Sequence, residues 1–272
     1  MKKSFLLALL AFVTVPFTAS GADAPATQPA ASPQNVGGIR GEAAAKGTGT
    51  VSGTVLFKGE KPTSRPLTDI SGNAFCKSCF VNKPLPMKDN IVLGKNKEAD
   101  TVQNVLVYVS KGLDGKTFEA PKERVVLDQV DCIYTPHVVA VMVGQTLDVK
   151  NSDATLHNVM AQPQQNKGFN FGMPVKDQIV EKVFTKPEFK INTRCFMHPW
   201  MSAYVHVLEH PFFAVTGPDG TFTLKGLPPG EYEITVLHES SQLEATPAVQ
   251  TIKVAADEGK KVDFSYQLRA AN

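Results

Sequence analysis

The stretch Cys195-Phe196-Met197-His198-Pro199-Trp200-Met201 carries a thiol, an imidazole and a thioether at intervals of three residues. A cysteine thiolate and two histidines in a trigonal plane, with a weak axial methionine, form the ligand set of mononuclear copper sites that transfer electrons. Three of these four groups lie in this one loop. His157, which follows a separate strand-like segment, offers the second imidazole. The sequence therefore predicts one copper ion bound by His157, Cys195, His198 and Met201.

The sequence before His157 supports a copper site over a chance spacing. Taken alone, the loop could consist of a small buried thiol and methionines that fill gaps in a core. Residues 141–151, however, read V-M-V-G-Q-T-L-D-V-K-N, and their last residue lies six positions before His157. This V-x-V-G-x-T strand and the short C-x2-H-x2-M loop resemble the cupredoxin family, the blue-copper proteins of amicyanin and plastocyanin type. The resemblance covers residues 122–209.

The resemblance implies roles for residues around the ligands. It implies a Greek-key β-sandwich in which Asn151 forms a hydrogen bond across to the cysteine loop and so helps to hold the ligands in place. It also implies that His198 reaches the surface through an apolar patch, here Phe196, Pro199 and Trp200, where a redox partner protein docks. The alternative for Trp200 is packing in the core.

The resemblance further implies an electron carrier that is not an enzyme, because this ligand set suits both Cu(I) and Cu(II) and no substrate bond is broken. Two alternatives stay open. The same ligands could serve copper storage or delivery without a redox partner. The protein could also be an extracellular interaction or glycan-binding β-sandwich protein whose copper site is structural.

A second pattern lies downstream of the copper ligands. Asp219-Gly220 predicts a tight hairpin turn, and Pro228-Pro229-Gly230 predicts another. Beyond the second turn, Tyr232, Ile234 and Val236 alternate with polar residues, as in a β-strand. The run D-G-T-F-T-L-K-G-L-P-P-G-E-Y at 219–232 resembles the carboxypeptidase regulatory-like (transthyretin-like) β-sandwich family.

The opening strands expected of that second family lie far upstream. Residues 49–62 and 104–109 resemble its G-x-V-x-G-x-V opening and its V-x-V strand, and both precede the cupredoxin-like stretch. This placement predicts that the cupredoxin is inserted into the other sandwich. The simpler alternative is a separate N-terminal β element in front of two tandem domains.

The whole chain is predicted to be all-β, because strand-like runs recur at short spacing and no segment keeps a helical period for three turns. Short helices are expected only within 160–190, and 62–100 is expected to be an irregular excursion. The predicted division is a signal peptide (1–24), a flexible linker (25–47), an N-terminal β segment (48–121), the cupredoxin (122–209) and the carboxypeptidase regulatory-like or Ig-like β-sandwich (210–272).

Composition excludes some functions. The 28 Lys and Arg residues nearly balance 26 Asp and Glu residues, for a net charge of +2. So small a charge cannot supply the phosphate attraction of a nucleic-acid binder. Lys2 and Lys3 followed by an apolar run at 5–17 are typical of a secretory signal, and that run is too short to span a bilayer. We therefore expect export across the inner membrane, to the periplasm, cell surface or extracellular space, with no membrane span.

Export changes the expected state of the cysteines, because thiols tend to pair in an oxidising compartment. With Cys195 as a ligand, Cys76, Cys79 and Cys132 remain. We predict a disulfide between Cys132 and either Cys76 or Cys79, worth about 4 kcal/mol, and one free thiol. A haem attachment site at Cys76-x-x-Cys79 is excluded because Phe80 stands where the histidine would be.

The remaining histidines are not expected to bind metal. His137, in T-P-H-V, lies at the end of a predicted strand and at no ligand position of the family. His206, His210 and His238 are spread over strand-like segments and show no ligand spacing.

Overall fold

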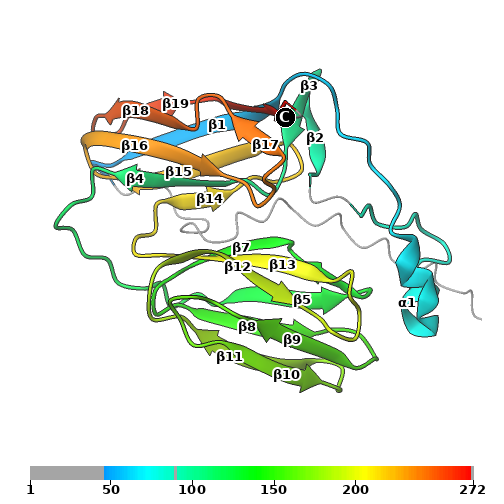
Figure 1. The fold of residues 1–272 in the computed structure, drawn as a ribbon. Helices are drawn as coiled ribbons and strands as arrows, with labels where there is room; N and C mark the ends of the chain where they lie inside the picture. The colour runs from blue at the N-terminus through cyan, green and yellow to red at the C-terminus, as the bar shows by residue number, and fades with distance from the viewer. Residues whose placement is uncertain (1–45, 89–90, 271–272) are drawn as a thin grey trace, which may run out of the picture. The chain divides into compact units, whose positions relative to one another are not determined.

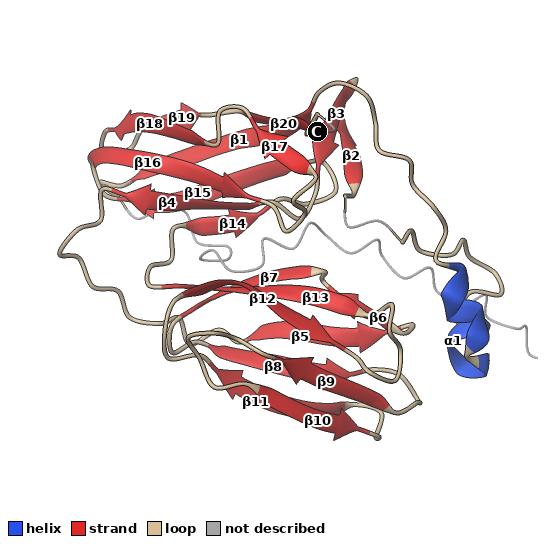
Figure 2. Cartoon of the chain, viewed as in Figure 1, coloured by secondary structure: helices blue, strands red, loops and turns tan. Residues whose placement is uncertain are grey.

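A computed structural model describes residues 46–88 and 91–270. Within this part of the chain, twenty β-strands form four sheets, and one α-helix and one 3-10 helix lie outside the sheets (Figures 1 and 2). The all-β prediction is therefore confirmed for these residues. No helix among them is long and apolar enough to cross a membrane. The predicted signal peptide (1–24) lies outside the described residues. Residues 25–45 of the predicted linker (25–47) lie outside them as well.

Residues 125–208 form a two-sheet unit that we call the central sandwich. One sheet has the strand order β10-β9-β12-β13-β7 and the other β11-β8-β5-β6. Apolar residues at alternate positions, such as Val125 and Leu127, pack with Val149 and Val205 in one buried cluster between the sheets. The strands are β5 (Val125–Val130), β6 (Ile133–Thr135), β7 (Val138–Met142), β8 (Thr146–Asn151), β9 (His157–Ala161), β10 (Phe169–Met173), β11 (Gln178–Val183), β12 (Glu188–Arg194) and β13 (Ser202–Leu208).

The other two sheets form a unit that we call the discontinuous sandwich, because its strands come from both sides of the central sandwich in the sequence. One sheet has the order β17-β20-β1-β3-β2, with β15 and β19 also paired to β1, and the other has the order β14-β4-β16-β18. The strands are β1 (Gly49–Phe57), β2 (Leu93–Asn96), β3 (Ala99–Val102), β4 (Leu106–Lys111), β14 (Phe213–Val215), β15 (Thr221–Leu227), β16 (Gly230–Leu237), β17 (Leu243–Ala245), β18 (Val249–Val254), β19 (Gly259–Lys261) and β20 (Phe264–Leu268).

Strand pairing joins the two ends of the described chain. β1 is antiparallel to β15, with Thr54 opposite Thr221, and β4 is antiparallel to β16, with Val107 opposite Val236. Figure 1 shows β1, in blue, among the orange and red strands. Gly53 permits the close approach of the segment between β19 and β20 to β1, because a Cβ there would lie 1.7 Å from the carbonyl oxygen of Val262. β1 and β4 thus pair with strands that follow the central sandwich in the sequence.

Two expectations for regular structure were wrong. Residues 160–190 contain no helix but the strands β10 and β11, whose alternating side chains fit a sheet. The expected excursion at 62–100 instead contains the 3-10 helix η1 (Thr68–Gly72), the helix α1 (Ala74–Ser78), β2 and β3. The side chain of Asn73 caps α1 by accepting a hydrogen bond from the backbone N–H of Cys76 at 3.1 Å.

A disulfide between Cys76 and Cys132 attaches this helical segment to the central sandwich. Cys79 is free, so the first of the two predicted pairings is the one that the structure shows. Leu67 and Ile70 are buried in the same apolar cluster as the sandwich strands. The helical segment is therefore packed onto the sandwich by apolar contacts and held there covalently.

Removing this disulfide should destabilise the protein. The bond closes a loop with a sequence separation of 56 residues, and the chain-entropy model gives about 4 kcal/mol for a loop of this length. We expect the double variant Cys76→Ala, Cys132→Ala to lose about that much unfolding free energy in urea denaturation. Cys79→Ala, which removes a free thiol from the same segment, is the matched control. Equal midpoints for the double variant and the wild type would contradict this prediction.

Candidate metal centre

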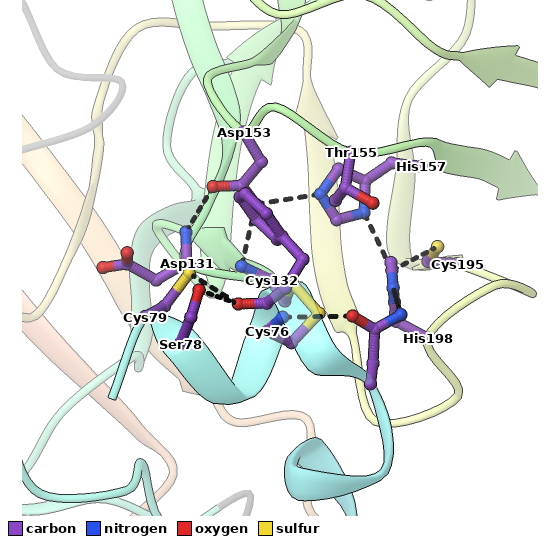
Figure 3. Close-up of a disulfide and its surroundings, with 12 residues drawn as sticks. Cys76, Ser78, Cys79, Asp131, Cys132, Asp153, Thr155, His157, Cys195 and His198 are labelled. Atoms are coloured by element: carbon purple, nitrogen blue, oxygen red, sulfur yellow. Dashed lines mark hydrogen bonds and ion pairs between the residues drawn. A yellow bond between two sulfur atoms is a disulfide. The ribbon is translucent and has the colours of Figure 1, made fainter. Parts of the chain in front are cut away.

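The structure brings three of the predicted ligands together (Figure 3). His157 is the first residue of β9, Cys195 follows the last residue of β12, and His198 lies in the loop before β13. The Nδ1 atoms of His157 and His198 are 3.0 Å apart, and the Sγ atom of Cys195 is 3.8 Å from Nδ1 of His198. One nitrogen from each histidine and the thiol sulfur thus share one small volume.

The fourth predicted ligand is buried beside this group. Met201 is 1% exposed and belongs to the same apolar cluster as Cys195. Its backbone N–H donates to the carbonyl oxygen of His198 at 2.8 Å, and its own carbonyl oxygen accepts from the N–H of Cys195 at 3.3 Å. These bonds close the loop into a tight turn, which is how a spacing of three residues brings the side chains together.

Asp153 fixes the orientation of His157. Its carboxylate lies 2.9 Å from Nε2 of His157 and also accepts the backbone N–H groups of Asp131 and Cys132, both at 2.8 Å. Burial opposes ionisation of Asp153, but these hydrogen bonds outweigh it and lower the pKa of the carboxyl group. Because Nε2 donates to a carboxylate, Nδ1 of His157 is left with its lone pair directed at Cys195 and His198.

Sequence reasoning missed Asp153. The available signal was its position four residues before His157 in N-S-D-A-T-L-H. Acidic residues are common in exposed loops. The spacing alone therefore could not distinguish a carboxylate that orients His157 from one that is solvated.

The environment of Cys195 favours its thiolate form. Burial alone would raise its pKa, but its polar contacts with His157 and His198 and the hydrogen bond from the backbone N–H of Asn158 lower the pKa to about 6. The N–H of Asn158 lies 3.4 Å from the sulfur. A thiolate is the form of cysteine that binds metal ions.

The hydrogen bond expected from Asn151 to the cysteine loop is absent among the described residues. The amide of Asn151 donates to the carbonyl oxygens of Thr155, Met173 and Val175 and thereby holds the loop before His157. Asn158 makes the link to the cysteine loop instead, since its Oδ1 accepts the N–H of Phe196 at 3.3 Å. The prediction for Asn151 was wrong because Asn158, one residue after a ligand, lies closer to that loop.

The expectation that His198 reaches the surface was also wrong. His198 is only 2% exposed, and Nδ2 of Asn73, the residue that caps α1, lies 3.3 Å from its Nε2 atom. The ring of Trp200 lies 5.2 Å from the imidazole. The helical segment held by the disulfide therefore covers the edge of His198 that the resemblance had placed in solvent.

The predicted docking patch is only partly exposed. Phe196 is 61% exposed and Pro199 is exposed, whereas Trp200 is half-buried and its Nε1–H donates to the carbonyl oxygen of Cys132 at 3.0 Å. Met197, which the prediction did not include, is 53% exposed. Two of the three exposed apolar side chains, Phe196 and Met197, therefore lie between Cys195 and His198 in the sequence.

The remaining histidines lie outside this group. His137 is at a strand end, between β6 and β7, and its ring nitrogens lie 3.0 Å from the carbonyl oxygen of Ser202 and 3.1 Å from a carboxylate oxygen of Glu239. His206 and His238 are buried, and burial lowers the pKa of both. His137 is therefore accounted for by its hydrogen-bond contacts, and His206 and His238 are accounted for by their burial.

The donor set fits copper. Two imidazole nitrogens and a thiolate, with a thioether nearby, are the ligands of mononuclear electron-transfer copper sites. The cluster of His157, Cys195 and His198 is buried, so little water would compete for a metal ion held there. Hard ions such as Mg²⁺ and Ca²⁺ require oxygen ligands, which this cluster lacks.

Comparisons with known proteins found a likeness in solved structures alone. No protein-family model and no curated protein matches the chain. A copper-containing nitrite reductase from Thermus scotoductus SA-01 aligns at 22% identity over 35% of this chain and 24% of its own (TM-score 0.31). A reduced amicyanin variant aligns at 23% identity over 37% of this chain and 97% of its own (0.28). A purple cupredoxin from Nitrosopumilus maritimus aligns at 22% identity over 31% of this chain and 97% of its own (0.26).

Asp153 provides a direct test of the centre. Asp153→Asn keeps the size of the side chain but removes its charge and turns an amide N–H toward one of its donors. Loss of a carboxylate that orients a metal-binding histidine typically lowers metal affinity about 10- to 100-fold. We expect the affinity for copper to fall by about that factor. Competition with a chelator of known affinity measures the change. Asp177→Asn is the matched control, since that side chain is 66% exposed; an equal loss there would remove the special role of Asp153.

Proposed function

We propose that this protein is an exported one-electron carrier with a single copper ion held by His157, Cys195, His198 and Met201. The observation that carries the proposal is the convergence of two histidine Nδ1 atoms and the Cys195 sulfur in one buried group. Bound copper would supply a couple between Cu(I) and Cu(II).

The residues around the ligands limit movement at the site. Asp153 holds His157 through Nε2, Asn158 holds the cysteine sulfur, and the turn from Cys195 to Met201 is closed by backbone hydrogen bonds. A site held in this way changes little in geometry when the charge of the metal changes, which favours rapid electron transfer. Four protein ligands leave no position for a substrate, so we propose a carrier and not an enzyme.

The partner is proposed to be a redox protein that contacts the exposed apolar side chains of Phe196, Met197 and Pro199. Phe196 directly follows the cysteine ligand, which gives a short covalent path from Cys195 to the surface. The covered edge of His198 makes that histidine a poor point of contact. Export is proposed from the leader-like N-terminal sequence, and the Cys76–Cys132 disulfide fits an oxidising compartment.

The visible spectrum of the copper-loaded, oxidised protein tests this function. Intense absorption toward the red end of the spectrum is expected, because a short bond between the thiolate and copper produces a charge-transfer band. Copper that binds without this band would support storage or delivery in place of electron transfer.

A further inference from the structure

We propose that a cavity beside the candidate metal centre binds a small neutral hydroquinone, which gives the proposed carrier its electron. The cavity has a volume of about 680 Å³, within the range of about 300 to 1,000 Å³ that is usual for sites of small organic molecules. Most of its lining comes from the segment 67–88, from β6 and from residues 199–202. Binding of the molecule does not depend on the metal, whereas its role as a donor rests on the proposed function.

The lining of the cavity is mainly apolar and includes two aromatic residues. Met87 and Ile133 are aliphatic or thioether residues of the lining, and Trp200 and Tyr134 are its aromatic ones. The hydroxyl of Tyr134 is already used, because it donates to the carbonyl oxygen of Asn158 at 3.2 Å. Aromatic rings gain more from packing on one another than the burial of their area alone provides. The lining therefore favours a flat aromatic molecule.

The charges around the cavity are paired. The ammonium group of Lys88 lies 3.1 Å from a carboxylate oxygen of Asp69, and both side chains are largely exposed. His137 also lines the cavity, and its two ring nitrogens contact Ser202 and Glu239. Among the described residues of the lining, no charged group is left to pair with a charged occupant. Because a charge without a partner is costly to remove from water, the cavity suits a neutral molecule.

One polar side chain of the lining is left for the occupant. Within residues 46–88 and 91–270, the side-chain amide of Asn104 makes no hydrogen bond, although its backbone N–H donates to the carbonyl oxygen of Thr216 at 3.1 Å. A side-chain amide can both donate to and accept from a hydroxyl group. The occupant is therefore expected to carry a hydroxyl on its ring.

The cavity lies next to the candidate ligands, which identifies the occupant as an electron donor. Trp200 and the proposed ligand Met201 both border the cavity, and the ring centroid of Trp200 is 5.2 Å from that of His198. A molecule packed on Trp200 is therefore close to the centre without occupying a ligand position.

The donor step balances in electrons and protons. A hydroquinone gives one electron to the copper centre, which passes from Cu(II) to Cu(I), and releases one proton to solvent. The ring leaves as a neutral semiquinone radical, and two such radicals yield one hydroquinone and one quinone. No bond to the metal is formed, so the protein remains a carrier.

Binding is measured first on the metal-free protein. Trp200 is the single tryptophan of the chain, so a ¹⁵N-labelled sample gives one indole N–H signal. Titration with hydroquinone under argon should shift this signal to saturation and give a dissociation constant. Cyclohexane-1,4-diol, which has two hydroxyls but no aromatic ring, should bind about tenfold more weakly. A signal that shows no saturable shift with hydroquinone, or equal binding of the diol, would overturn the proposal.

Two variants locate the binding in this cavity. Asn104→Gly removes the amide, and glycine tolerates the positive φ of 62° at this position, so affinity should fall about 2- to 10-fold with the fold intact. Met87→Glu adds a charge to the apolar lining and should weaken binding by about tenfold. Val81→Glu, on the same segment but 73% exposed and not part of the lining, is the matched control and should bind as the wild type does. Unchanged affinity in both Asn104→Gly and Met87→Glu would place the ligand elsewhere and refute the proposal.

The copper-loaded protein tests the donor role. After mixing with hydroquinone, the rate at which the visible band disappears should level off at high hydroquinone concentration, with half-saturation near the dissociation constant of the metal-free protein. A rate that rises linearly through concentrations well above that constant would overturn the donor role. A copper-loaded protein without a visible band would instead contradict the proposed carrier, while the indole signal of Trp200 still reports on the binding of hydroquinone.

Discussion

Cys195→Ser, loaded with Cu(II), is expected to lose the intense visible band of the wild type completely. A serine hydroxyl cannot provide the charge transfer from thiolate to copper, whereas the imidazoles of His157 and His198 remain to bind the metal. The loss should therefore appear in the absorption spectrum while some copper stays bound. Retention of the wild-type band by this variant would refute the assignment of Cys195.

Two control variants make the result specific to the proposed ligands. Met201→Gln should keep copper and colour but shift the reduction potential, because an axial ligand tunes the site without defining it. His137→Ala should leave the spectrum unchanged, since His137 contacts Ser202 and Glu239 and not the ligand cluster. A bleached His137→Ala protein would show that the ligand set is wrong.

The candidate ligands could be named from sequence because their chemistry is local. Cys195, His198 and Met201 lie within seven residues, so a single turn brings them together without help from distant contacts. His157 needed one further inference, that its strand lies beside that turn. The alternation of apolar and polar residues was enough to predict the strands next to His157 and next to the Cys195–Met201 turn.

The cover over His198 could not be predicted, because it depends on a contact between residues 125 positions apart. Asn73 and α1 lie in a segment with many prolines and no apolar period, so the sequence offered no register for placing it. The pairing of Cys76 with Cys132 fixes that register, and two choices of partner for Cys132 were equally open before the structure.

Turns and strand patterns on both sides of residues 195–201 predicted strands of the discontinuous sandwich and left both an inserted and a tandem arrangement open. Val105, Val107 and Val109 lie in one buried apolar cluster together with Tyr232 and Ile234. The V-x-V strand expected at 104–109 begins only at Leu106, however, because Asn104 adopts a positive φ of 62° and leaves a break between β3 and β4. A single asparagine in a run of valines gave no clear warning of that break.

We propose that residues 122–209 are an inserted domain, and the isolated fragment 210–272 should therefore be unfolded. In the whole chain β15 pairs with β1, and β16 pairs with β4 on one side. The fragment lacks both partners, which leaves unpaired strand edges and exposes the face that packs against Val51 and Val107.

A companion protein tests the same proposal in the opposite direction. Residues 122–209 are replaced by a short Gly-Ser linker, and Leu67 and Ile70, which lose their partners in the central sandwich, are changed to serine. This protein retains β1, β4, β15 and β16, so a dispersed amide spectrum is expected from it and a collapsed one from 210–272. A dispersed spectrum from 210–272 alone would favour tandem domains, because that fragment would then need no strand from the N-terminal side. An unfolded companion protein would also count against insertion, since an inserted domain should leave its host able to fold.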